Sequence, residues 1–307
     1  MIYKLNPTLA TYLWGGRKLI TEYNKQSTAQ IVAESWEMSV HKDGLSAINV
    51  DGIDTTLLSF VNTYPQLLGE SASINLMIKL IDAKRNLSVQ VHPNDLQASI
   101  YGDNGKTEMW YILNAEPQSL LYFGFNRAVS KEQFATLIER GEVESVLNSV
   151  PVSKGDCFLI EAGTLHAIGA GISLLEVQES SNLTYRVYDY NRVDSDGKKR
   201  ELHIDKALDV IDFDKINCKK CNTRSVKRAN ATYTQLVDCA YFLSTEISAR
   251  GKVVIPSENV YSEITFVEGN GKINDLLFVK GDSFFIPAYQ TITILGDFIA
   301  VVTTPKK

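Results

Sequence analysis

The chain has 307 residues, of which 44% are hydrophobic and 22% charged, so it is long enough for one large globular domain or two smaller ones. Its formal net charge of -5 and pI of about 5.5 exclude a general basic field that would bind nucleic acid or an anionic membrane. The N-terminus lacks the pattern of a secretory leader, and no segment approaches the roughly 18 apolar residues of a membrane span. We therefore expect a soluble, cytoplasmic protein that can take a small anionic ligand in a local basic pocket.

Three segments have the 3.6-residue period of amphipathic helices, namely 54–69, 130–148 and 203–212. Short strands with turn signals account for most of the remaining chain; the clearest span 88–92, 108–115, 119–125, 156–162, 172–179, 183–190, 240–248, 252–256, 262–268, 275–279, 282–288 and 291–296. Because these strands do not alternate with helices, the pattern predicts a mainly β fold of antiparallel sandwich or barrel type, with a few decorating helices.

Four cysteines, Cys157, Cys218, Cys221 and Cys239, do not form a disulfide framework in a chain of this length. Cys218 and Cys221 have C-x-x-C spacing, but no second pair or nearby histidine completes a zinc knuckle. A functional C-x-x-C pair is therefore the less favoured interpretation.

The chain repeats itself at a distance of 126 residues: KGDCFLIEAGTLHA at 154–167 matches KGDSFFIPAYQTIT at 280–293. A Gly-Asp turn followed by a hydrophobic strand and a corner is typical of jelly-roll barrels, so the repeat predicts two of them. The copies differ at the histidines, because Ile292 stands opposite His166 and, in a looser match, Ile255 stands opposite His92. If these histidines only packed a barrel, isoleucine would serve, so the difference favours a chemical role in the first copy.

The segment SVQVHPND at 88–95 alternates polar and apolar residues and then stops at a proline. Gln90 and His92 are two residues apart, so they project from the same face of the strand. Together with Glu108, which begins the next strand, and His166, in a predicted corner, they form a candidate divalent-metal site with a position open to water or substrate.

The other two histidines have structural interpretations. His41 lies in a polar turn, and His203 is expected to cap the helix that begins near Ile204. In the strand downstream of His166, alternation predicts that Glu176 and Arg186 face one cavity. Arg186 could bind an anionic oxygen there, or it could be a surface residue paired with Asp189; the spacing supports both equally.

These segments resemble the short bacterial form of class I phosphomannose isomerase, in detail from about residue 10 to 205. The matching stretches are WGGRKL, ESWEMS, LSVQVHP, GKTEMWYIL, AGTLHAIGAGISLLEVQESS and TYRVYDYNR. The resemblance implies two cupin-type jelly-roll barrels, one zinc ion per chain and interconversion of mannose 6-phosphate and fructose 6-phosphate. It also implies a metal-binding catalytic cupin domain at 1–225 and a degenerate second barrel without metal ligands at 226–307.

Carried over by position, the resemblance assigns His92, Glu108 and His166 as zinc ligands and Gln90 as a further ligand. It assigns Arg186 and Lys106 as catalytic and substrate-binding residues. Strand alternation adds Glu176 as a further residue expected at the substrate. One position departs from the family, since Asn182 stands where an acidic residue is common and an amide cannot act as a general base.

The implied chemistry is proton transfer between two carbons through a cis-enediol, with zinc polarising the substrate oxygens. A zinc-bound water, Lys106 and Glu176 are all candidate bases, and Lys84, Arg85, Lys106 and Arg186 are candidate phosphate ligands. Two other functions fit parts of the pattern: a non-haem iron oxygenase, which uses the same ligand types, and a non-catalytic sugar-phosphate sensor, which Asn182 favours. The sequence does not determine the oligomeric state.

Overall fold

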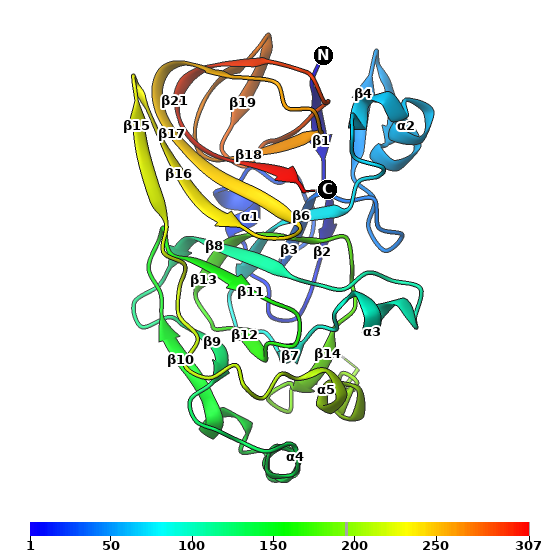
Figure 1. The fold of residues 1–307 in the computed structure, drawn as a ribbon, viewed down its shortest axis with the longest axis vertical. Helices are drawn as coiled ribbons and strands as arrows, with labels where there is room; N and C mark the ends of the chain where they lie inside the picture. The colour runs from blue at the N-terminus through cyan, green and yellow to red at the C-terminus, as the bar shows by residue number, and fades with distance from the viewer. Residues whose placement is uncertain (194–195, 307) are drawn as a thin grey trace.

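The computed structural model describes residues 1–193 and 196–306 (Figure 1). Strands form most of the regular structure, and the helices in these ranges are short and lie at the periphery of the sheets (Figure 1). The prediction of a mainly β fold with a few helices is confirmed. None of the helices in the described ranges is long and apolar enough to span a bilayer.

Two sheets carry the residues around the predicted metal site. The strand order of the larger sheet is β11 (Cys157–Ile160), β8 (Glu108–Ala115), β13 (Ile172–Glu179), β6 (Leu76–Ala83), β3 (Glu34–Met38) and β2 (Thr8–Ala10). The strand order of the smaller sheet is β10 (Leu147–Pro151), β9 (Leu120–Phe125), β12 (His166–Ile168), β7 (Val89–Val91) and β14 (Tyr185–Tyr188). All pairings between their strands are antiparallel.

A third sheet forms the upper part of the molecule in Figure 1. Its order is β15 (Arg224–Arg228), β16 (Ala231–Asp238), β17 (Phe242–Ile255), β21 (Ile292–Pro305), β18 (Ser262–Ile273), β20 (Ser283–Ile286), β1 (Tyr3–Asn6), β4 (Ala47–Val50) and β5 (Ile53–Thr56), and β19 (Leu276–Val279) pairs with β18. Three strands from the N-terminal fifth of the chain, β1, β4 and β5, thus belong to the sheet of the C-terminal residues. The division at residues 225 and 226 stays a prediction, and so does the closure of two separate barrels.

The predicted helices exist but are shorter than expected. Segment 54–69 contains α2 (Leu57–Thr63) and the 3-10 helix η1 (Pro65–Leu68), because 54–56 pairs with β4 instead. Segment 130–148 contains α4 (Lys131–Arg140) and η2 (Val143–Val146); the predicted Ser130–Gln133 capping box is present, and Gly141 in the left-handed region ends α4. Segment 203–212 contains α5 (Ile204–Val210), whereas α1 (Lys18–Thr21) and α3 (Asp95–Ser99) were not predicted.

Several buried apolar clusters hold the sheets together. One cluster includes Trp110, Phe123 and Phe158 and lies between the two sheets that carry the metal-site residues. Another includes Phe266 and Phe284 and belongs to the third sheet. Burying an aliphatic or aromatic side chain of this size contributes about 1.5–3 kcal/mol, so these clusters fix the strands that carry the polar site.

The sequence repeat corresponds to equivalent turns in the two halves. Gly155 and Gly281 both have a positive φ, +91° and +94°, before β11 and β20. In the second half Ile255 and Ile292 are directly paired across β17 and β21, and in the first half His166 pairs with Gln90 across β12 and β7. The two isoleucines are thus direct partners, and the two histidines are also neighbours, since their ring centroids lie 4.8 Å apart.

Candidate metal centre and active site

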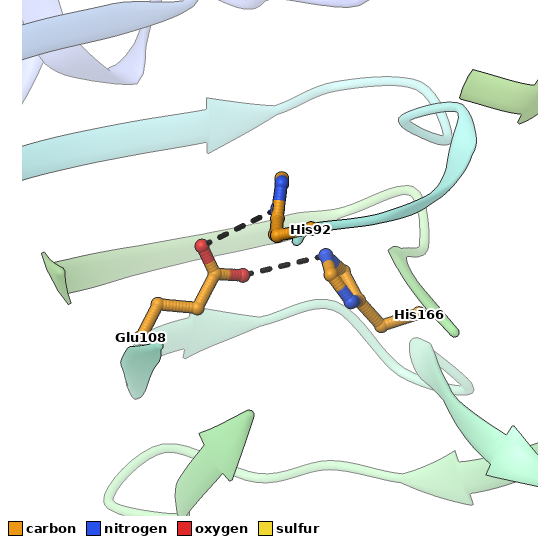
Figure 2. Close-up of side chains that lie close together, drawn as sticks. All are labelled: His92, Glu108 and His166. Carbon is orange, nitrogen blue, oxygen red and sulfur yellow. Dashed lines mark ion pairs between the residues drawn. The ribbon is translucent and has the colours of Figure 1, made fainter. Parts of the chain in front are cut away.

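The structure brings together the three predicted metal ligands. His92 directly follows β7, Glu108 begins β8, and His166 begins β12. One ligand atom from each lies within 4.8 Å of the others. Figure 2 shows the Glu108 carboxylate facing both imidazoles, with His92 Nε2 3.7 Å from Oε2 and His166 Nε2 3.4 Å from Oε1.

Local sequence explains why these side chains converge. β7 ends at Val91, directly before His92, and Pro93 lacks the N–H donor that would continue the pairing. Asn94 is then the N-cap of α3 and forms a capping box with Gln97. Glu108 is paired with Ile160 on one side and Gln178 on the other, so its backbone is held by strands on both sides. The side chains of all three ligands are at most 1% exposed.

Backbone carbonyls orient both imidazoles. His92 Nδ1 lies 2.7 Å from Leu183 O, and His166 Nδ1 lies 2.8 Å from Thr164 O. A carbonyl oxygen only accepts, so each Nδ1 carries the proton and each Nε2 keeps a lone pair that faces Glu108. The tautomers are therefore set for metal coordination through Nε2.

The charge state of the three residues suits the same role. Burial lowers the pKa of His92 well below 6.5, and the Lys106 ammonium adds to this shift. Burial also lowers the pKa of His166 to about 4, and it raises the pKa of Glu108 to about 7 although Lys106 opposes this. Both imidazoles are consequently neutral at pH 7 and need lose no proton to bind a cation.

The buried polar atoms fit a divalent cation. Among the described residues, His92 Nε2 and Glu108 Oε1 are buried and make no hydrogen bond. Unsatisfied buried polar atoms are costly in a fold, and a cation held by two imidazole nitrogens and a carboxylate oxygen would satisfy them. Two nitrogens and one carboxylate are a common zinc donor set with room for a further ligand.

Gln90 is also beside this centre. Its Nε2 lies 3.5 Å from His166 Nε2, and its Oε1 accepts a hydrogen bond from Ser88 Oγ at 3.4 Å. As placed, the amide therefore turns its nitrogen to His166. It would have to rotate to present the oxygen to a cation.

A cavity of about 250 Å³ opens beside the centre and is lined mainly by polar side chains. Gln90, Lys106, Glu176 and Arg186, which the sequence analysis singled out, all line it. The Lys106 ammonium is 3.1 Å from Glu108 Oε2 and 4.0 Å from Glu176 Oε1, so it links the metal centre to the cavity.

Glu176 is held in a buried network that sequence reasoning missed in part. Trp110 Nε1 donates to Glu176 Oε2 at 3.1 Å, and Lys79 Nζ lies 3.3 Å from Oε1. Lys79 also lies 3.6 Å from Glu34 Oε2 and over the Trp36 ring. Burial alone would raise the pKa of Glu176, but the ammonium groups of Lys106 and Lys79 outweigh it and lower the pKa below 4.5.

A signal for Lys79 existed in the sequence. The run LMIKLIDA at 76–83 places one lysine inside an apolar strand, and a lysine is almost never fully buried unless paired. Lys79 is directly opposite Glu176 in the sheet, a pairing that the sequence does not reveal.

Two arginines, Arg186 and Arg200, line the cavity. Arg186 is directly opposite Gln90 in the sheet, and its guanidinium donates to Ser88 Oγ and to Glu201 O. Arg200, which the sequence analysis did not select, lines the same cavity. Burial lowers the pKa of Arg186, and the nearby Arg200 cation adds to this shift.

The salt bridge suggested between Arg186 and Asp189 is not formed. Asp189 instead accepts from Arg200, at 2.8 Å from Nε, and from Arg192. Of the candidate phosphate ligands, Lys84 and Arg85 line a different surface pocket with Arg17 and Lys18. They are therefore not placed to contact a ligand in the cavity of Arg186.

Three other positions named in the sequence analysis, His41, His203 and Asn182, lie outside the metal centre. His41 lies in a turn, as predicted, and its Nδ1 accepts from the Asp43 N–H. His203 occupies the N-cap position of α5 but makes no side-chain cap bond; its Nδ1 accepts the Arg186 N–H at 3.2 Å. Asn182 lines the cavity and donates to Asp43 Oδ2 at 2.9 Å.

A cavity of similar volume in the C-terminal half has no lysine, arginine or histidine among the described residues that line it. It is lined mostly by apolar side chains, including Ile255 and Ile292 at the positions that match His92 and His166. The fold and the site together define a cupin-type protein with a candidate divalent-metal centre in its first half.

Comparisons with known proteins identify the family. The catalytic-domain description of type I phosphomannose isomerase matches residues 2–119. Mannose-6-phosphate isomerase ManA of Bacillus subtilis (strain 168) is 35% identical over 291 residues, which cover 92% of this chain and 91% of the relative. Mannose-6-phosphate isomerase of Streptococcus mutans serotype c is 34% identical over 284 residues, which cover 90% and 89%.

The fold agrees with this relationship. The crystal structure of the mannose 6-phosphate isomerase from Bacillus subtilis matches with a TM-score of 0.92 at 29% identity, and the match covers 99% of both chains. The chain belongs to the type I phosphomannose isomerase family.

Proposed function

We propose that this chain is a zinc-dependent isomerase that interconverts D-mannose 6-phosphate and D-fructose 6-phosphate. The observation that carries the proposal is the buried His92, Glu108 and His166 donor set beside a polar cavity that contains lysine and arginine side chains. The activity printed in the names of the relatives supports the choice of substrate. The free cysteines of the chain support a cytoplasmic location, where thiols stay reduced.

The metal centre has a defined role in this proposal. A zinc ion held by His92, Glu108 and His166, with Gln90 as a further donor after rotation of its amide, would act as a Lewis acid towards the substrate oxygens. Because isomerisation involves no net electron transfer, a metal without redox chemistry suits it.

Lys106 and Glu176 are placed to handle charge and protons. Glu176 is ionised at neutral pH and lines the cavity, so it can accept the proton that leaves carbon; the Lys79 ammonium, 3.3 Å from Oε1, keeps it ionised. The Lys106 ammonium beside it stabilises negative charge that develops on the substrate oxygens on the way to a cis-enediol.

Arg186 and Arg200 are assigned to the phosphate. Guanidinium groups bind phosphate bidentately, and both of these line the cavity, whereas Lys84 and Arg85 line a different pocket. Replacing Arg200 with methionine should raise the KM for mannose 6-phosphate by about 10–100-fold, since a charge-assisted bond contributes about 1.5–3 kcal/mol. The matched control is Arg192→Met, which also removes a contact to Asp189 but no cavity-lining group.

The deciding experiment measures conversion of mannose 6-phosphate to fructose 6-phosphate by purified protein, by chelated protein and by chelated protein resupplied with zinc. Activity lost with the chelator and recovered with zinc is the expected result. His92→Ala should lose the metal and the activity while its far-ultraviolet circular dichroism stays unchanged, whereas His41→Ala should keep both. Absence of turnover in zinc-loaded protein, or activity that requires iron and consumes oxygen, would contradict the proposal.

A second experiment tests the assigned proton-handling residues. We expect Glu176→Gln to bind zinc normally and to lose about 10²–10⁴-fold in kcat. Lys106→Met should keep the metal and lose kcat as well. A kcat within about threefold of wild type in Glu176→Gln would show that another group accepts the proton.

A further inference from the structure

Two cysteines that are far apart in the sequence lie against each other in the structure. Cys157 begins β11 and is 1% exposed, and Cys221 lies partly exposed in the segment between α5 and β15. The Cys221 N–H donates to Cys157 O at 2.7 Å, and the Cys221 side chain packs against the apolar cluster that contains Cys157.

This contact meets one requirement of a disulfide, which is the close approach of the two backbones. A direct backbone hydrogen bond between two residues keeps their Cα atoms close to the roughly 4–7 Å separation found in disulfides. Interaction with the other thiol is the largest cause of the pKa shift at each of the two cysteines, so their side chains are close together.

The C-x-x-C partner of Cys221 points elsewhere. The side chain of Cys218 packs against a different apolar cluster, the one that contains Trp110 and Phe123, and its sulfur contacts the backbone at Gly124. Cys239 likewise makes its own contact, donating to Phe242 O. The pair formed by folding is therefore Cys157 with Cys221, and not the pair suggested by spacing.

We propose that Cys157 and Cys221 form an oxidation site that reacts with hydrogen peroxide and closes to an intramolecular disulfide. The site is separate from the isomerase chemistry, since neither sulfur lines the cavity beside the metal centre.

The two thiols have complementary properties for this reaction. Hydrogen bonding from Cys157 lowers the pKa of Cys221, which favours the nucleophilic thiolate at the more exposed sulfur. The same bond, together with burial, raises the pKa of Cys157, which keeps the second sulfur protected until the first has reacted. A partly exposed thiolate next to a resolving cysteine is typical of sites that oxidise selectively.

The reaction balances as two displacements. The Cys221 thiol first releases its proton to solvent, and the thiolate attacks one peroxide oxygen. The O–O bond breaks, a Cys221 sulfenic acid forms, and the leaving hydroxide takes up a solvent proton to become water. The Cys157 sulfur then attacks the Cys221 sulfur, the S–O bond breaks, and the hydroxyl leaves as a second water with the proton of Cys157. Two thiols are oxidised, and one peroxide is reduced to two waters.

A disulfide at this position would join the two halves of the molecule. Cys157 Sγ also lies 3.9 Å from Leu236 O in β16, so it sits where β11 meets the third sheet. The bond would close a loop of roughly 60 residues and fix the segment before β15 onto β11. Closing a loop of this length stabilises the fold, and we expect the melting temperature to rise by about 2–6 °C.

The test treats the full-length, zinc-loaded protein with hydrogen peroxide. The free thiols are counted in denaturant, the intact mass is measured, and peptides are mapped without reduction. Wild type should lose two thiols and about 2 Da and should yield a peptide linking Cys157 to Cys221. Dithiothreitol should reverse the mass change and the rise in melting temperature.

Matched variants make the test specific. Cys218→Ser should behave like wild type, whereas Cys221→Ser should keep the Cys157 thiol and show no rise in melting temperature. Both variants should retain the basal isomerase activity. A peptide linking Cys218 to Cys221, a disulfide between two chains, or a stable oxygen adduct on Cys221 without a link to Cys157 would each overturn the proposal.

Discussion

Replacing Lys79 with methionine should lower the free energy of unfolding, because it removes a buried positive charge beside Glu176 and Glu34. The Lys79 side chain is 4% exposed, and its ammonium lies 3.3 Å from Glu176 Oε1 and 3.6 Å from Glu34 Oε2. Methionine keeps a long, flexible stem in the same space but removes the charge. Removing one partner of a buried ion pair costs about 3–5 kcal/mol, because the other charge stays buried without compensation.

The loss should depend on pH with a defined sign. The pKa of Glu176 in the folded protein is lowered, so this carboxylate stabilises the fold above its unfolded value of 4.5, and the contribution disappears as pH falls through the folded value. Without the Lys79 ammonium, the effect of burial on Glu176 is less opposed, so the pKa of Glu176 in the folded protein rises. The variant then gains stability as acid protonates Glu176, and its deficit relative to wild type shrinks.

Urea denaturation at pH 8 and pH 5.5, with a chelator in every sample, measures this difference. We expect a deficit of about 3–5 kcal/mol at pH 8 and a clearly smaller one at pH 5.5. Lys84→Met is the control, since the Lys84 side chain is 62% exposed and its ammonium is 3.9 Å from Glu116 Oε1, and its effect should stay within about 0.5 kcal/mol. A deficit below about 1 kcal/mol at pH 8, or an equal deficit at both pH values, would refute the reasoning.

Two further predictions concern the repeat and the cavity. Gly155→Ala and Gly281→Ala both place alanine at a positive φ, which costs about 1–2 kcal/mol. The added Cβ has no atom within 4 Å at Gly155, whereas at Gly281 it lies 2.1 Å from Tyr23 O. Thermal denaturation should show a distinctly lower melting temperature for the second variant; equal values would contradict the packing argument. His203→Ala removes the acceptor of the Arg186 N–H and should lower kcat/KM for mannose 6-phosphate by roughly fivefold at a stability cost of about 1 kcal/mol or less. An unchanged kcat/KM would show that Arg186 is positioned without it.

The sequence predicted most of the site because short-range patterns carry the information. Alternation along a strand places Gln90 and His92 on one face whatever the surroundings, and Pro93 marks the strand end through its missing N–H. The comparison of the two copies of the repeat identified His92 and His166 as exceptions to an aliphatic pattern. The structure then brings these residues to Glu108. Their roles as ligands stay predictions, as do the roles of Lys106, Glu176 and Arg186.

The helix limits were predicted less well, since they depend on single residues and on competition with pairing. The period at 54–69 continues through 54–56, but these residues gain more hydrogen bonds by pairing with β4. Gly141 ends α4 although apolar residues recur beyond it. Its backbone is left-handed, and its N–H donates to the carbonyls of Leu137 and Ile138 in the last turn.

What the sequence alone determined is therefore the mainly β pattern, the repeat and the ligand candidates, all of which follow from local periodicity and residue chemistry. Only the tertiary structure placed β1 beside β20, Lys79 opposite Glu176, Arg200 in the cavity and Cys157 against Cys221. Each of these contacts joins segments that no local period relates. They form because burial of the apolar faces of three sheets determines which strands become neighbours. The buried polar side chains on those strands are then hydrogen-bonded or ion-paired to side chains of the neighbouring strands.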